Sequence, residues 1–125
     1  MNENYVSFEV AKLLKEKGFD WLVNHYYNKF GNFNNTYGTW ENYSDLVGEL
    51  MISAPTLCMA QKWLRETKSI HIDISAFEDN YYALLFKTNG SFIKDMVNDG
   101  PNKNCIWNSY EDALNAGILE ALKLI

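Results

Sequence analysis

Cysteine is scarce in this sequence, and its placement excludes the common cysteine-based architectures. The two cysteines, Cys58 and Cys105, lie far apart and form no Cys-x-x-Cys motif. Free thiols in a reducing compartment are therefore expected, rather than a structural disulfide. The two histidines, His25 and His71, likewise have no metal-ligand spacing, so we expect neither a bound metal nor another cofactor.

Long apolar runs are also missing. No stretch approaches the roughly 18 apolar residues that could span a bilayer, and residues 1–5 are not a basic region followed by an apolar one. Such a sequence carries no signal for export or membrane insertion. We therefore expect a cytoplasmic protein with no membrane partner.

Positive charge is in deficit, with 11 Lys and Arg against 16 Asp and Glu and a formal net charge of -5 at pH 7. An acidic surface repels phosphate backbones, so nucleic acid is not an expected partner. A basic stripe could come only from Lys62, Arg65 and Lys68, and the same segment also carries Glu66.

Motifs of the common enzyme classes are absent too. The sequence has no glycine-rich phosphate loop, nucleophile elbow, zinc spacing or acidic metal-binding motif. Catalytic groups can converge from distant positions, so an enzyme is unsupported rather than excluded.

Three segments have apolar residues at helical spacing, namely 8–17, 56–67 and 109–125. Ser7 can cap the first helix, and Pro55 suits the first turn of the second. The third segment begins with Ser109 and Asp112, a weaker form of the capping box. These signals predict three helices.

Four segments have the composition or alternation of strands, namely 21–27, 37–41, 70–75 and 81–87. Residues 44–52 fit either a short helix or an irregular connection, and 92–97 fit one short element within a loop. The element order α-β-β-α-β-β-α predicts a single α+β domain over residues 1–125. In it, an antiparallel sheet of about four strands has its helices packed on one face.

The predicted helices also carry a resemblance. The segments concerned are 6–19 (VSFEVAKLLKEKGF), 54–56 (APT) with 61–66 (QKWLRE), and 110–114 (YEDAL) with 120–125 (EALKLI). In these segments the chain resembles a family of uncharacterised small proteins from gut bacteria and their phages or mobile elements. That family has no established activity, so the resemblance implies a cytoplasmic accessory or phage-related protein and assigns no catalytic residues.

Aromatic residues make up 15% of the chain and gather between residues 25 and 43, interleaved with asparagines. Rings beside amide groups form good recognition surfaces. The alternative is a hairpin whose rings pair across strands and fill the core. Because both alternating sets of the first strand contain large rings, we predict that some remain exposed. The predicted contact patch comprises Tyr26, Tyr27, Phe33, Tyr37 and Trp40.

Two further groups of residues could carry chemistry. His71 and Asp73 are two residues apart on a predicted strand, so they share a face and could share a proton or a metal. A solvated sheet face explains the pair equally well. Cys58 lies in the first turn of a helix with Lys62 one turn later, which favours a thiolate. An ordinary exposed thiol is the commoner arrangement.

These patterns favour a non-enzymatic accessory or binding protein acting through protein contacts. Its partner would be an unknown protein or a second copy of the chain in a homodimer. One alternative is a binder of single-stranded nucleic acid or carbohydrate that uses the same aromatic residues. The other is a small enzyme with an unrecognised site. Whether the aromatic residues between 25 and 43 are buried or exposed decides between a hairpin core and a binding surface.

Overall fold

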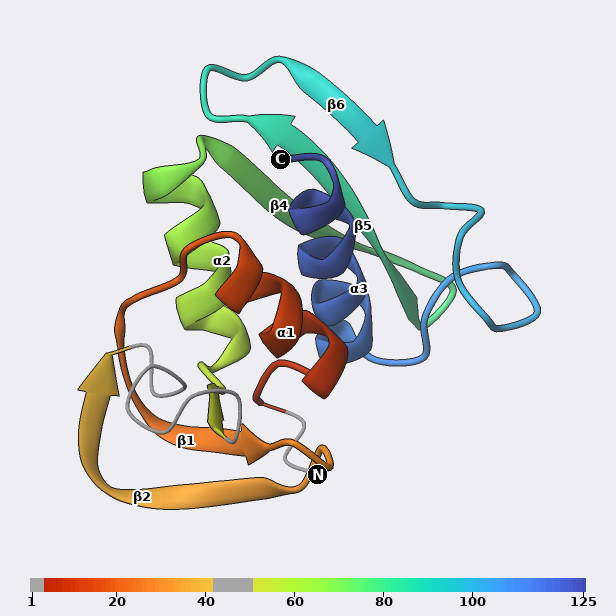
Figure 1. The fold of residues 1–125 in the computed structure, drawn as a ribbon. Coiled ribbons are helices and arrows are strands. Elements are labelled where there is room, and N and C mark those ends of the chain that lie inside the picture. The colour runs from red at the N-terminus through yellow and green to blue at the C-terminus, as the bar shows by residue number, and fades with distance from the viewer. Residues whose placement is uncertain (1–3, 42–50) are drawn as a thin grey trace. The chain divides into compact units, whose positions relative to one another are not determined.

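The computed structural model describes residues 4–41 and 51–125. Within them, three helices and six strands form two three-stranded antiparallel sheets (Figure 1). The predicted α+β class is confirmed, although the prediction of about four strands in one sheet was too low. The chain divides into two units, Met1–Thr56 and Leu57–Ile125, and each is described by itself below. A single domain over the whole chain stays a prediction.

The first unit contains α1 (Phe8–Glu16), β1 (Leu22–Asn28), β2 (Phe33–Glu41) and β3 (Met51–Ser53), with the strand order β2-β1-β3. The Ser7 hydroxyl accepts a hydrogen bond from the Val10 backbone N–H at 3.3 Å, so the predicted N-cap is confirmed. Gly18 follows the helix at a φ of 92°. That left-handed conformation, which suits glycine, turns the chain towards β1.

The turn between β1 and β2 explains why β2 begins before residue 37. The Asn28 side-chain oxygen accepts hydrogen bonds from the backbone N–H groups of Phe30 and Asn32 at 2.9 and 3.0 Å. This side chain closes the turn early, so the strand starts at Phe33. Of the segment 44–52, residues 44–50 lie outside the described part, and the strand β3 begins at Met51.

The second unit contains α2 (Leu57–Thr67), β4 (Ile70–Phe77), β5 (Asn80–Lys87), β6 (Phe92–Asp95) and α3 (Tyr110–Lys123), with the strand order β4-β5-β6. The predicted strands at 70–75 and 81–87 are confirmed as β4 and β5, which pair antiparallel. The short element expected at 92–97 is the strand β6. The hydroxyl of Ser109 accepts a hydrogen bond from the Asp112 N–H at 3.0 Å, as the capping motif predicts. No helix in the described ranges is long and apolar enough to cross a membrane.

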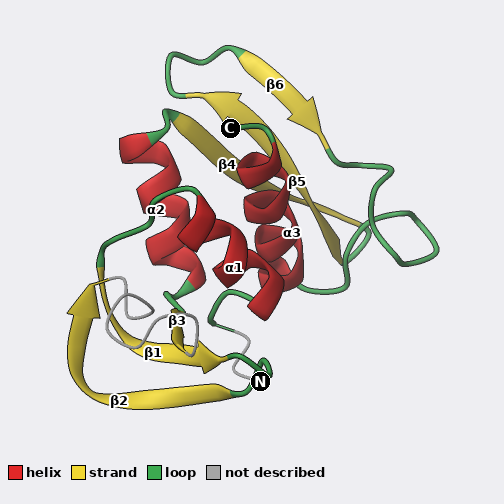
Figure 2. Ribbon diagram, viewed as in Figure 1, coloured by secondary structure: helices red, strands yellow, loops and turns green. Residues whose placement is uncertain are grey.

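Both helices of the second unit pack on the same face of its sheet, as Figure 2 shows. Ile72 and Ala83, which are buried on that face, lie against Gly117 of α3. A Cβ at Gly117 would lie 2.9 Å from Ile72 Cγ2 and 3.0 Å from the Ala83 Cβ. The absence of a side chain at this position therefore allows α3 to approach the sheet closely.

Candidate functional site

The aromatic residues of the first unit pack mainly on one another. The rings of His25 and Phe33 are stacked at a centroid distance of 5.0 Å, and the Tyr5 ring lies 4.5 Å from His25 and 5.0 Å from Phe33. The Tyr27 ring contacts Phe33 edge-on at 5.5 Å and Phe8 at 5.4 Å. These five rings form one cluster, in which Tyr27 is buried and the other four are half-buried.

Tyr27 belongs to the core of this unit. Its side chain is 2% exposed, and its hydroxyl donates a hydrogen bond of 2.6 Å to the Val6 carbonyl oxygen. Burial raises the pKa of the Tyr27 phenol above its ordinary value. The structure thus corrects the assignment of Tyr27 to a contact surface, because a ring anchored in this way is not available to a partner.

Of the other members of the predicted patch, the two whose side chains are described, Tyr26 and Phe33, are not brought together. In the register of β1 and β2, Tyr26 pairs with Asn34 while Tyr27 pairs with Phe33. Tyr26 and Phe33 therefore lie on opposite faces of the sheet, and both are half-buried. Tyr37 and Trp40 lie on β2, and their side chains are outside the described part of the chain.

The second sheet leaves large side chains exposed on the face opposite its helices. The strand register places one set of residues there, and we call this set the open face: His71, Asp73, Ser75 and Phe77 on β4, Tyr82, Leu84 and Phe86 on β5, and Phe92 and Asp95 on β6. Phe77 is 53% exposed and Phe92 is 59% exposed. The rings of Phe86 and Phe92 meet edge-on at 5.7 Å. No helix of this unit covers these side chains.

Sequence reasoning missed the open face because it relied on the alternation of β4. Polar residues alternate with isoleucines there, which indicates an ordinary wet face. The strand β5, in contrast, is apolar on both sides, since Leu84 and Phe86 on the open face alternate with the buried Ala83 and Leu85. The continuous apolar run at 81–86 was the available signal.

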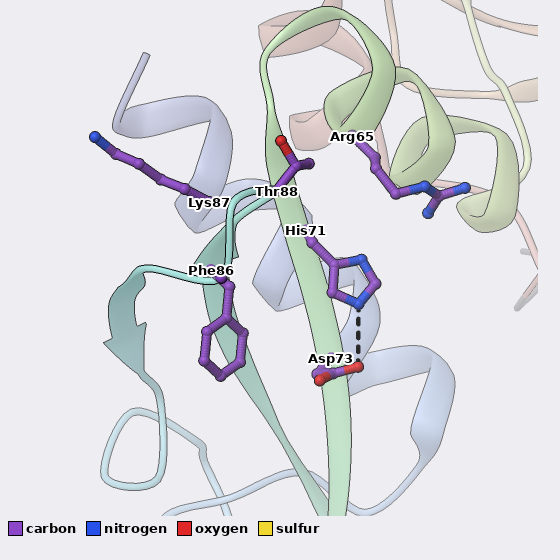
Figure 3. Close-up of a pocket in the computed structure, with 7 residues that line it drawn as sticks. Arg65, His71, Asp73, Phe86, Lys87 and Thr88 are labelled. Atoms are coloured by element: carbon purple, nitrogen blue, oxygen red, sulfur yellow. Dashed lines mark hydrogen bonds and ion pairs between the residues drawn. The ribbon is translucent and has the colours of Figure 1, made fainter.

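A hollow of about 470 Å³ lies at one end of the open face, lined by Arg65, His71, Asp73, Phe86, Lys87, Thr88 and Gly90 (Figure 3). The predicted shared face of His71 and Asp73 is confirmed, since the two side chains are joined by a contact of 3.2 Å between His71 Nε2 and Asp73 Oδ1. Figure 3 also shows Arg65 coming from α2 beside the His71 ring.

The geometry of this pair does not suit proton transfer to a ligand. Nε2 of His71 is engaged by Asp73. Nδ1 is buried and has no hydrogen-bond partner among the described residues. A general acid or base must present a nitrogen to the reacting group. Within the described ranges, no group of three His, Cys, Asp or Glu side chains could hold a metal ion.

Cys58 and Cys105 are both free and exposed, so the described chain contains no disulfide between them. Cys58 lies in the first turn of α2, as predicted. The Lys62 ammonium, which was expected to favour its thiolate, lies 3.8 Å from a Glu66 carboxylate oxygen instead. Among the described residues, Lys62 is therefore paired with Glu66 rather than with this thiol.

No family model, no curated protein and no solved structure matches the chain.

Proposed function

We propose that this chain is a non-enzymatic binding protein that acts through protein contacts, and that the open face of β4, β5 and β6 is its contact surface. One observation carries the proposal: the open face exposes Phe92 beside the half-buried Phe86 at one end and Phe77 at the other, with the half-buried Leu84 between them. Large apolar side chains exposed on one face of a protein mark a candidate interaction site.

The chemical layout of the open face supports this function. Its middle strand contributes Leu84 and Phe86, whereas the outer strands contribute the exposed rings of Phe77 and Phe92 together with the polar residues His71, Asp73 and Asp95. Protein interfaces combine apolar and polar side chains in this way. Large aromatic anchors supply much of the binding free energy in such interfaces.

The partner that we assign to this surface is a second copy of the chain. Two sheets can pack face to face with their side chains interdigitating, about 10 Å apart. A twofold axis then uses the same patch on both copies. The resemblance to small proteins of gut bacteria and their phages or mobile elements adds a cytoplasmic accessory role to this proposal.

The aromatic cluster of the first unit gives less support to the nucleic-acid and carbohydrate alternatives. A base or a sugar binds by stacking on an open ring face. The rings of Tyr5, His25 and Phe33 are engaged with one another. The ring faces needed for such a ligand are thus already used within the unit.

Sedimentation equilibrium over a wide range of protein concentration tests this function. The wild-type chain should self-associate, and a Phe77→Ser/Phe92→Ser double variant should do so at least about tenfold more weakly, because two exposed apolar anchors are removed. Phe30→Ser is the matched control, since Phe30 is 77% exposed but lies in the first unit.

Two outcomes of the sedimentation experiment would contradict the proposal. One is a wild-type chain that stays monomeric up to millimolar concentration. The other is equal self-association of the wild type, the double variant and the control. Thermal melts of all three proteins should coincide closely, because substitutions at exposed positions usually change stability by about 0.5 kcal/mol or less.

A further inference from the structure

A second hollow, of about 490 Å³, lies in the same unit where β4 begins, β5 ends and α3 ends. Its volume falls within the roughly 300–1,000 Å³ typical of small-molecule sites. The hollow is separate from the centre of the open face, and it has two chemical features that belong together.

The first feature is an aliphatic wall built from three elements. Ile70 is the first residue of β4, Ile93 belongs to β6, and Leu124 caps the end of α3. Ile70 is buried and Ile93 is half-buried, whereas Leu124 is 51% exposed. An aliphatic ligand that packs against this half-exposed leucine and the two isoleucines would remove apolar surface from water, which is energetically favourable.

The second feature is a pair of lysines. Lys68 and Lys87 line the same hollow, and neither forms an ion pair among the described residues. The Lys68 ammonium lies 5.5 Å from the centre of the Trp63 ring, which restricts its position. Lys87 also lines the first hollow, but in Figure 3 its side chain extends away from the His71 ring.

The backbone holds the two lysine-bearing segments together. The Thr88 N–H donates a hydrogen bond of 3.0 Å to the Ser69 carbonyl oxygen. Each of these residues directly follows one of the two lysines in the sequence. The fold therefore holds the backbone segments that carry the two lysines side by side, in a chain whose net charge is -5.

We propose that this hollow binds a small aliphatic carboxylate. The aliphatic chain packs on Ile70, Ile93 and Leu124, and the carboxylate accepts hydrogen bonds from Lys68 and Lys87. Charge-assisted hydrogen bonds are stronger than neutral ones, so the anion adds selectivity to the apolar contact. This ligand site goes beyond the contact function of the open face, and neither depends on the other.

Isothermal titration calorimetry with octanoate tests the site. Octanoate should bind saturably at one site per chain, whereas acetate, which lacks the chain, and octanol, which lacks the charge, should bind at least about tenfold more weakly. Lys68→Gln and Lys87→Gln should each weaken octanoate binding by about tenfold, as expected for a lost charge-assisted hydrogen bond. Leu124→Ser should weaken it as well.

Lys62→Gln is the matched control. Lys62 is exposed on α2, the helix that ends just before Lys68, but it is paired with Glu66 and does not line the hollow. This variant should bind octanoate like the wild type.

Three results would overturn the proposal: no saturable octanoate binding, octanol binding as tightly as octanoate, or equal losses in Lys62→Gln and the two lysine variants of the hollow. The Phe77→Ser/Phe92→Ser double variant separates this test from that of the contact surface. It should bind octanoate with unchanged affinity even though its self-association is weakened.

Discussion

The sheet β2-β1-β3 and the sheet β4-β5-β6 both contain strands with large side chains on two faces, but they place those side chains differently. In the first sheet, Tyr27 and Phe33 pack with neighbouring rings, and the Tyr27 hydroxyl is bonded to the backbone. In the second, helices cover one face while Phe77 and Phe92 stay exposed on the other. Aromatic content alone therefore does not locate a contact surface, because pairing register and helix packing decide which rings are covered.

The helix-covered side of the second sheet should show the largest effect of substitution. Leu64 of α2 is fully buried, so Leu64→Ala should lower the free energy of unfolding by about 2 to 5 kcal/mol through lost burial and a residual cavity. Denaturant titration followed by circular dichroism measures this change. Leu124→Ala, at a half-exposed position, is the control and should cost much less. Equal midpoints for Leu64→Ala and the wild type would show that this face is not the core.

The second-largest effect on stability is expected where α3 approaches the sheet closely. Gly117→Ala gains about 1 kcal/mol of helix propensity, but its Cβ would crowd Ile72 and Ala83. Overpacking of this kind costs about 1 to 3 kcal/mol, so we expect a net loss of stability in thermal and denaturant unfolding. A variant about 1 kcal/mol more stable than the wild type would contradict the packing at this position.

In the first sheet, the buried hydroxyl of Tyr27 provides a test of the core assignment. Tyr27→Phe leaves the Val6 carbonyl without its partner, which should cost about 1 to 3 kcal/mol. Phe30→Ser, at an exposed position of the same unit, should cost about 0.5 kcal/mol or less. If denaturant titration ranks these two variants in the reverse order, Tyr27 does not anchor the aromatic cluster.

The smallest expected effect is a pH dependence from His25. Burial lowers the pKa of His25 from its ordinary value of 6.5, so the unfolded chain binds more protons than the folded chain at pH values just below 6.5. The contribution of His25 to stability is therefore fully present above that pH and is lost as the pH falls through the lowered folded value. His25→Gln should flatten the slope of stability against pH in this window. An unchanged slope would exclude His25 as its source.

Much of the fold could be predicted because its signals are local. Ser7 and Ser109 mark helix starts that the structure confirms, and the alternation at 70–75 predicts β4. The early start of β2 could not be predicted, because it depends on the Asn28 side chain closing the turn. The count of about four strands was too low because β3 and β6 have only three and four residues, and β6 lies between loop signals.

The candidate sites were harder to predict, because each depends on contacts between distant segments. Because side chains alternate along a strand, His71 and Asp73 were predicted to share a face of β4, and the contact between them confirms it. The same alternation cannot tell which face of β1 becomes the core, so Tyr27 was misassigned. Arg65 joins His71 at the first hollow only through the packing of α2 beside β4.

A dilution series followed by ¹H–¹⁵N correlation spectra tests the central claim most directly, because it compares the two sheets in one sample. As the protein concentration rises, the amide signals of the open face, such as those of Asp73, Leu84 and Phe92, should shift progressively. Those of Tyr26 and Phe33 on the first sheet should stay constant. Shifts confined to Tyr26, Phe33 and their neighbours, with an unchanged open face, would contradict the account and return the contact surface to the aromatic hairpin.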